Sequence, residues 1–222
     1  MKYAVIFDVD GVLLELTRDE EEIFFASFAS RLDSTTLSRD WDSYKIRNDQ
    51  DIIAEIVERG GLPGREAQAI AQEYLTALDD ALQNKLKSVP IQGAAAMLER
   101  LAPLATLGIA TANFHRAAEL RLKQCAMWDH VSLFAYGGDG GGAKSAILAR
   151  VIAALGLPDS QIIFIGDNVT DVEAGLANNT NFIGFSTSPL RRQKLRAAGA
   201  KYVCSTHIQT EKLVREILYA SI

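Results

Sequence analysis

Short apolar runs alternate with amphipathic segments from residue 93 to the C-terminus, and no other feature constrains the fold as strongly. The runs that have the length of buried strands cover residues 107–110, 131–135, 161–165, 182–185 and 201–204. The segments between them have the apolar spacing of amphipathic helices, as in residues 143–155. Strands in strict alternation with helices form a parallel sheet with helices on both faces. The pattern therefore predicts an α/β protein with a Rossmann-like parallel sheet.

One more strand is predicted at the N-terminus, where the apolar run 3–7 stops at Asp8. After it the alternation is interrupted, because residues 15–87 contain helix-like segments and few candidates for a buried strand. The helices are expected near residues 20–31, 50–59 and 65–86. We therefore expect an all-helical insertion at 15–87, within a core domain made of residues 1–14 and 88–222.

Charge and cysteine content exclude several classes of function. The 23 lysines and arginines against 28 aspartates and glutamates leave a net charge of −5, which lacks the basic surface that nucleic acid or an anionic membrane requires. Cys125 and Cys204 have no metal-ligand spacing and are too few for a disulfide scaffold. No apolar run approaches the roughly 20 residues of a membrane span. We expect a cytoplasmic monomer or homodimer that binds neither nucleic acid nor membrane.

Polar residues follow several predicted strands at the points where those strands end. In chain order they are Asp8, Asp10, Thr111, Asn113, Lys144, Asp167 and Asp171. Lys144 begins a helix after the glycine-rich run 137–142, which lacks the Walker spacing and is interpreted as a mobile connection. Ligands of open α/β sheets bind beyond the carboxyl ends of the strands, so these side chains should meet in one cleft.

Such a cleft would crowd several aspartates together, and like charges at short range cannot all stay ionised unless a cation joins them. Oxygen ligands without histidine or cysteine favour a hard ion, and Mg²⁺ also accepts phosphate oxygens. Lys144 would add a fixed positive charge, while Thr111 and the backbone amides after it can donate to phosphate. The residues therefore predict a magnesium-dependent phosphate site with a carboxylate nucleophile.

Four strings carry a family resemblance: Asp8-Val-Asp-Gly-Val12, Thr111-Ala-Asn113, Lys144 and Gly166-Asp-Asn-Val-Thr-Asp171. They resemble, in the correct order, the four motifs of the haloacid dehalogenase superfamily. The helical insertion resembles the cap of its C1 subfamily, which includes phosphoglycolate phosphatase and β-phosphoglucomutase. The first and fourth motifs are specific, whereas the second and third are identified by their order and their places at strand ends. The resemblance covers essentially the whole chain.

The resemblance implies a role for each motif residue. Asp8 would attack the phosphorus and become an aspartyl phosphate, and Asp10 would protonate the leaving oxygen and later activate water. Magnesium would be held by the Asp8 carboxylate, the Asp10 backbone carbonyl and Asp167, with Asp171 supporting the metal shell. The transferring phosphoryl group would be bound by Thr111, Ala112, Asn113 and Lys144.

The function expected from the resemblance is that of a phosphoric monoester hydrolase acting on a small phosphorylated metabolite, of the phosphoglycolate or sugar-phosphate type. A phosphosugar mutase of the same family remains an alternative, because mutases keep every motif named above. The other alternative is a non-catalytic module whose aspartate is phosphorylated as a signal. Such modules lack both the second aspartate and a cap, so Asp10 and the insertion argue against this alternative.

The insertion is expected to close as a lid over the Asp8 edge of the sheet and keep random water from an aspartyl phosphate. Its hinges would lie near residues 14–17 and 86–90. Its most polar loop holds Tyr44, Lys45 and Arg47, and those cations would suit an anionic substrate. The alternative for these three residues is a solvated loop before a helix.

Overall fold

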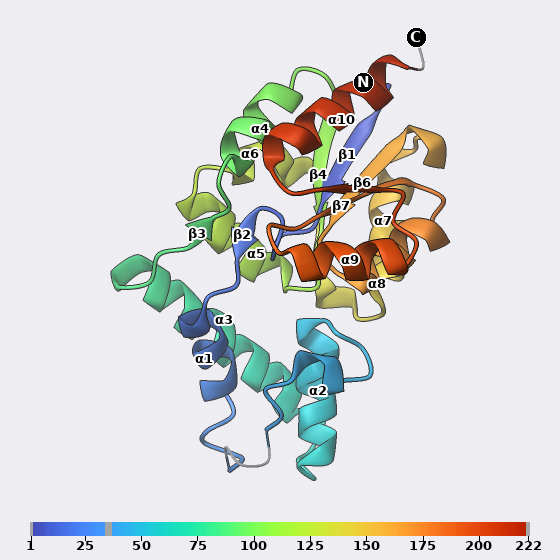
Figure 1. Cartoon of the computed structure of the whole chain (residues 1–222). Coiled ribbons are helices and arrows are strands. Elements are labelled where there is room, and N and C mark those ends of the chain that lie inside the picture. Colours follow the sequence, from blue (N-terminus) through green and yellow to red (C-terminus); the bar gives the residue numbers. More distant parts are fainter. Residues whose placement is uncertain (1, 34–36, 221–222) are drawn as a thin grey trace.

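The computed structural model describes residues 2–33 and 37–220, so residues 34–36 of the predicted insertion lie outside the described part (Figure 1). Its main sheet is built from β1 (Ala4–Phe7), β4 (Thr106–Ala110), β5 (Ala135–Tyr136), β6 (Ile162–Gly166), β7 (Asn181–Phe185) and β8 (Tyr202–Cys204). The strand order is β5-β4-β1-β6-β7-β8, and every pairing is parallel. The predicted α/β fold class is confirmed.

The central strand β1 brings three loops to the same edge of the sheet. It pairs in parallel with β4 on one side and β6 on the other, with Phe7 opposite both Ile109 and Ile165. Every residue of β1 is buried, as expected for a parallel strand that is covered on both faces. The residues that follow these three strands therefore emerge next to one another.

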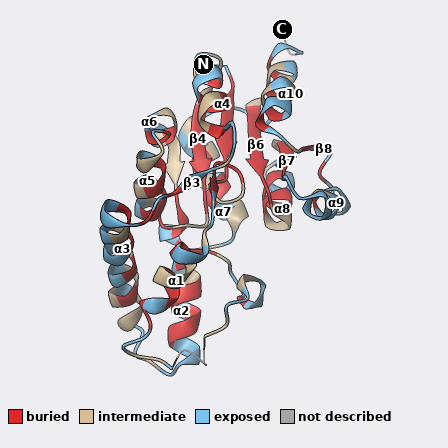
Figure 2. Cartoon of the chain, turned by 60° about the vertical axis from the view of Figure 1, so that its left-hand side comes forward, coloured by how far each residue is buried: buried red, intermediate tan, exposed pale blue. Residues whose placement is uncertain are grey.

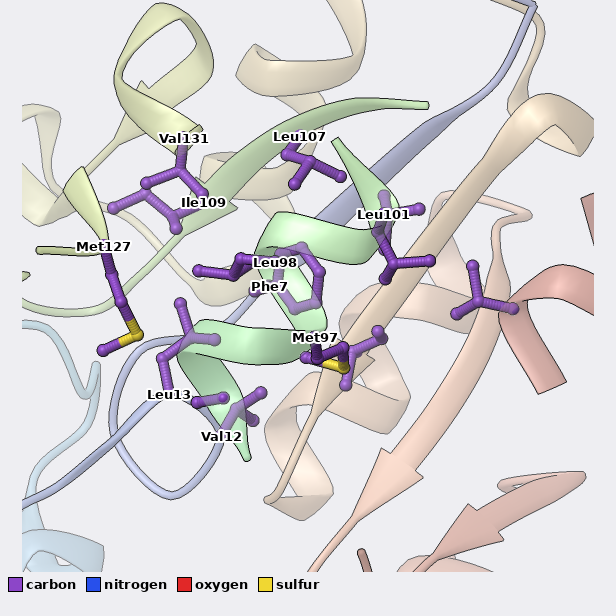
Figure 3. Packing of buried hydrophobic residues seen from close by; sticks show 14 of the residues in the cluster. Phe7, Val12, Leu13, Met97, Leu98, Leu101, Leu107, Ile109, Met127 and Val131 are labelled. Atoms are coloured by element: carbon purple, nitrogen blue, oxygen red, sulfur yellow. The ribbon is translucent and has the colours of Figure 1, made fainter. Parts of the chain in front are cut away.

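One face of the sheet is covered by α4 (Ala94–Leu101), α5 (His115–Gln124), α6 (Trp128–Val131) and α10 (His207–Tyr219). Figure 3 shows this packing, in which the α4 residues Met97 and Leu98 lie over Phe7 of β1. Because side chains alternate along a strand, Val5 and Phe7 point to this face, and Ala4 and Ile6 belong to the opposite cluster.

The opposite face is covered by α7 (Lys144–Leu155), α8 (Val169–Ala177) and α9 (Pro189–Ala197). Here Ile147 and Val151 of α7 join Ile6 and Phe164 of the sheet in one buried cluster. The helix ends at Gly156, which adopts the left-handed conformation that such helix ends favour. Figure 2 shows that the central strands of the sheet are buried. The packing places Lys144, the first residue of α7, at the edge where β1 ends.

The helical insertion lies below this edge in Figure 1 and has its own core. It contains α1 (Arg18–Ala26), a 3₁₀ turn at Trp41–Ser43, α2 (Asp49–Arg59) and α3 (Glu66–Asn84). Its centre includes Phe24, Phe28, Ile53, Ile70 and Leu78. The first helix ends earlier than predicted, at Ala26. Among the helices of the described residues, none is long and apolar enough to cross a membrane.

Two further features of the fold differ from the sequence prediction. The run 131–135 is not a strand: α6 ends at Val131, a 3₁₀ turn follows at Ser132–Phe134, and the strand β5 is only Ala135–Tyr136. A short apolar run cannot by itself distinguish a buried strand from a buried helix end. The second feature is an unpredicted antiparallel pair, β2 (Leu14–Glu15) with β3 (Val89–Pro90), which ties the two connections of the insertion together.

Candidate active site

The Asp8 carboxylate lies at the carboxyl end of the central strand. The Asp8 backbone N–H donates to the Ile165 carbonyl at 2.8 Å, which extends the sheet ladder by one residue and fixes the start of the loop. The Val9 N–H then donates to Asp8 Oδ1 at 2.8 Å. The same oxygen lies 2.7 Å from the Lys144 ammonium nitrogen. Asp8 is therefore buried and held by one backbone donor and one cation.

Lys144 stands between two carboxylates. Its Nζ lies 2.7 Å from Asp8 Oδ1 and 3.0 Å from Asp171 Oδ1. Burial lowers the pKa of Lys144, but the carboxylates of Asp171 and Asp8 raise it by more, so the amine keeps its proton. The third motif, predicted from a single residue, thus places a buried positive charge beside the predicted nucleophile.

Three buried carboxylates cluster at this edge. Asp8, Asp167 and Asp171 each offer an oxygen, and these oxygens lie within 4.8 Å of one another. Burial holds the pKa of Asp8 well above its usual range; Lys144 opposes this shift, whereas Asp171 and Asp167 add to it. Burial likewise raises the pKa of Asp167 to about 7, and Asp171 adds to that rise. A cation at this cluster would offset both the cost of burying these charges and the repulsion between them.

The donor set of the cluster suits a hard divalent cation. All three residues present carboxylate oxygens, which Mg²⁺ prefers over nitrogen and sulfur ligands. One carboxylate oxygen of Asp171 already has hydrogen-bond donors. Its Oδ2 accepts from the backbone N–H groups of Asp167 and Asn168 at 3.1 Å each and so caps α8. Asp8 and Asp167 are therefore the better candidates for direct contact with an ion.

Asp10 lies on the same loop and is held by two donors. Its Oδ1 accepts from Arg121 Nη2 at 2.7 Å, and its Oδ2 accepts from Asn113 Nδ2 at 3.0 Å. The Asp10 side chain is 24% exposed, whereas that of Arg121 is 2% exposed. The structure thus places Asp10 at the cavity with both carboxylate oxygens fixed.

The residues of the second motif differ in whether they reach the cavity. Thr111 is buried, and its hydroxyl accepts from the Asn113 N–H and donates to Asn113 Oδ1, both at 3.2 Å. Ala112 and Asn113 line the cavity, whereas Thr111 stands behind them. The carbonyl of Ala112 accepts from the Asp49 N–H at 3.0 Å, so the insertion contacts this loop directly.

A cavity of about 1570 Å³ separates the sheet edge from the insertion. Residues from all four predicted motifs line it, namely Asp8, Asp10, Ala112, Asn113, Lys144, Asp167 and Asp171. Lys45 and Arg47 of the insertion line it as well. The structure therefore brings the motif residues to one site, as the strand-end argument expected.

The three residues predicted from the polar loop of the insertion do not all lie at the cavity: Lys45 and Arg47 line it, whereas Tyr44 does not. Arg47 pairs with Asp42, and its Nη2 donates at 3.3 Å to Oγ1 of Thr170, which belongs to the fourth motif. Tyr44 is buried among the helices of the insertion, where its hydroxyl donates to the Ser38 carbonyl at 2.6 Å. Tyr44 is turned away from the cavity because its ring completes the core of the insertion.

Two arginines at the site were not predicted. Arg191, near the start of α9, forms an ion pair with Asp167. Arg121 lies on the buried face of α5 with Ala117, Ala118 and Leu122. The signal for Arg121 was present in the sequence, since an arginine at the apolar spacing of a helix implies a buried partner for its charge. The position of Arg191 has no comparable signal.

Comparison with known proteins gives a consistent match. The family model described as haloacid dehalogenase-like hydrolase matches residues 3–179. A predicted phosphatase from Clostridium acetobutylicum is 20% identical with a TM-score of 0.70, and the match covers 97% of this chain and 99% of that one. CbbY from Rhodobacter sphaeroides, in complex with phosphate, is 16% identical with a TM-score of 0.72, over 93% and 95% of the two chains.

A hydrolase of the same family from Deinococcus radiodurans, with bound phosphate and sodium, is 22% identical with a TM-score of 0.61. This match covers 96% of the present chain and 95% of that protein. At these identities the structural similarity concerns the fold. No curated protein matches the chain significantly.

Proposed function

The chain belongs to the haloacid dehalogenase-like hydrolases, and from this premise we propose that it is a magnesium-dependent phosphatase. Its substrate would be a small phosphorylated metabolite of the phosphoglycolate or sugar-phosphate type. The observation that carries the proposal is the contact between Lys144 and Asp8, 2.7 Å apart, beside the carboxylates of Asp167 and Asp171. A carboxylate nucleophile, a fixed cation and a set of metal ligands then face one cavity.

The geometry supports phosphoryl transfer in two steps. In the first, Asp8 Oδ attacks the phosphorus and the bond to the leaving oxygen breaks, while Asp10 gives that oxygen a proton. Lys144 stands where it can offset negative charge on the phosphoryl oxygens. Asp8 and Asp167 would hold the magnesium ion, which when bound neutralises charge on the same oxygens.

In the second step the aspartyl phosphate on Asp8 is hydrolysed. Asp10, now a carboxylate, takes a proton from the attacking water, and this restores the acid form for the next cycle. Asn113 donates to Asp10 at 3.0 Å and can keep the carboxylate aimed at the cavity in both steps. Inorganic phosphate then leaves.

The proposal includes a lid made of residues 15–87. Contacts at the start of α2 support it: the Asp49 N–H donates to the Ala112 carbonyl at 3.0 Å, and Asp49 Oδ2 accepts from the Phe114 N–H at 2.8 Å. The β2–β3 pair brings the two connections side by side, which suits a hinge. Closure would protect the aspartyl phosphate from random water.

The direct test of the proposed function measures phosphate release from p-nitrophenyl phosphate with and without Mg²⁺. A panel of phosphorylated sugars, phosphoglycolate and nucleotides then identifies the substrate class. A phosphatase releases phosphate from its substrate, whereas a mutase yields a phosphorylated isomer without stoichiometric release. Absence of release from every ester in the panel would refute the phosphatase assignment.

Gly11→Ala should lower kcat/KM by about a hundredfold, because a small displacement of reacting groups is enough for such a loss. Gly11 has a φ of 76°, and a Cβ at this position would overlap the Asp167 carboxylate. The substitution should therefore also weaken binding of Mg²⁺, which calorimetric titration measures. Gly64→Ala is the matched control, because open space surrounds Gly64. Wild-type values for both quantities in Gly11→Ala would contradict the assigned geometry.

Arg47→Ala should raise KM more for a metabolite with a second anionic group than for p-nitrophenyl phosphate. Arg47 lines the cavity beside Thr170, where its cation can reach a substrate group remote from the phosphoryl oxygens. Arg59→Ala provides the control, since Arg59 lies over the Tyr44 ring in the same segment. If KM rises equally for both substrates, or for neither, Arg47 does not contact the substrate.

A further inference from the structure

Arg121 is the most connected side chain near the cavity to which the proposed mechanism gives no role. It lies on α5, next to α3 of the insertion (Figure 1). Its Nη2 donates to Asp10 Oδ1 at 2.7 Å and to the Glu15 carbonyl at 3.1 Å, and its Nε donates to Glu20 Oε1 at 2.8 Å. The guanidinium thus joins the Asp10 loop to the first connection of the insertion.

The partner Glu20 is itself held by the start of α1. Glu20 is 3% exposed, and its Oε2 accepts from the Thr17 N–H at 2.8 Å and from the Thr17 hydroxyl at 2.9 Å. The first of these contacts and the Glu20 N–H, which donates to Thr17 Oγ1 at 3.3 Å, form the capping box of α1. The position of the Arg121 guanidinium therefore depends on how the first helix of the insertion is docked.

Arg121 also orients the second donor to Asp10. Its Nη1 donates to Asn113 Oδ1 at 3.3 Å, and Thr111 donates to the same oxygen. With Oδ1 of Asn113 occupied in this way, Nδ2 is the atom that faces Asp10 Oδ2. One buried guanidinium thus donates to the Asp10 carboxylate directly and also helps to orient Asn113, the second donor.

Stability alone does not account for this arrangement. A buried arginine between two carboxylates is expensive to desolvate, and apolar replacements of similar volume are often as stable. The fork of an arginine does supply fixed directions for several hydrogen bonds at once, which a single ammonium cannot reproduce. The contacts therefore favour a role in orientation.

We propose that Arg121 is a positioning residue for Asp10, held in place by Glu20 of the insertion. This inference rests on the proposed function, in which Asp10 gives a proton to the leaving oxygen and later takes one from water. Arg121 occupies Oδ1 of Asp10, so both proton transfers go through Oδ2, where Asn113 uses one lone pair and the other remains for the proton. Arg121 exchanges no proton itself. Undocking of α1 would withdraw Glu20 and loosen Asp10, so acid catalysis is efficient only when the insertion is docked.

The test compares kcat/KM for phenyl phosphate and p-nitrophenyl phosphate, which have similar shapes. Phenolate is the more basic leaving group and needs protonation, whereas nitrophenolate departs with little help. Arg121→Lys should therefore lower kcat/KM for phenyl phosphate by about tenfold more than for p-nitrophenyl phosphate. Glu20→Gln should change the ratio of the two kcat/KM values, phenyl phosphate over p-nitrophenyl phosphate, in the same direction by a smaller factor. The ratio is diagnostic because a merely structural defect lowers both values equally.

Arg116→Lys is the matched control. Arg116 lies on the same helix and links it to the insertion through Asp79 at 3.1 Å, without a contact to Asp10. Its substitution should leave the ratio of the two kcat/KM values unchanged. An equal loss for both esters in Arg121→Lys, with the wild type active, would overturn this inference and leave the phosphatase assignment standing.

A double variant that removes both charges of the Arg121–Glu20 pair covers the case in which Arg121→Lys does not fold. The Asp10 carboxylate, 24% exposed, then keeps Asn113 as its donor. Glu20→Gln with Arg121→Gln replaces the ion pair by two amides that can bond to each other, and thermal unfolding verifies its fold. The same rise in leaving-group dependence is expected for this double variant. An unchanged ratio would overturn the inference, and a wild type that hydrolyses neither ester would overturn the inference and the proposed function together.

Discussion

Asp8→Asn is expected to reduce turnover by several powers of ten, because loss of a covalent nucleophile leaves only binding and electrostatic contributions. An amide cannot form the acyl phosphate, yet its oxygen can still accept from the Val9 N–H and from Lys144. The fold should therefore persist. The substitution also removes one of three crowded buried carboxylates, so the midpoint of thermal unfolding without metal should not fall.

The Asp8 measurement pairs steady-state kinetics with thermal unfolding. Asp129→Asn on the exposed side of α6 makes the same chemical change away from the cavity and should keep wild-type turnover. Turnover of Asp8→Asn within tenfold of the wild type would show that Asp8 is not the nucleophile.

Removal of divalent cations is the second change with a large expected effect. Excess chelator should abolish phosphate release, and Mg²⁺ should restore it, because three buried carboxylates gather at this site and a divalent cation would offset their negative charge and that of the phosphoryl group. Calcium should inhibit, since it prefers more ligands and longer bonds than magnesium and would draw Asp8 away from in-line attack.

The metal prediction has a readout that does not depend on activity. Titration with Mg²⁺ should raise the unfolding midpoint of the wild type, because a ligand that binds the folded state stabilises it. The rise should be much smaller in Asp167→Asn, which lacks one of the candidate ligands. Full activity in excess chelator would refute the carboxylate-cluster assignment.

The fold was predictable because strongly periodic segments dominate the chain after residue 93. The run at Ile162–Gly166 and the helix at Lys144–Leu155 are examples, since their apolar spacing matches the burial that the structure shows. The two-residue strands β2 and β3 could not be predicted, because Leu14–Glu15 and Val89–Pro90 are too short to have a period and pair only through tertiary contacts.

The candidate site was predictable to the extent that it follows strand ends. Asp8 and Asp167 lie directly beyond β1 and β6, so the parallel topology alone brings them together. Arg191 reaches Asp167 from α9, and the sequence has no pattern that relates a helix start to a carboxylate so far away along the chain. Tyr44 was assigned to a polar loop by composition, but its aromatic ring is buried in the core of the insertion.

If Asp8 is the nucleophile, turnover passes through an acyl phosphate, which is a mixed anhydride, on the Asp8 carboxylate. The most direct test mixes the enzyme with Mg²⁺ and excess substrate, quenches the mixture in acid, reduces it with borohydride and maps the peptides by mass spectrometry. Borohydride reduces an aspartyl phosphate to homoserine, so we expect homoserine at position 8, dependent on substrate and absent in Asp8→Asn. Homoserine at another aspartate, or unmodified Asp8 throughout turnover under conditions that trap acyl phosphates, would show that Asp8 is not the nucleophile.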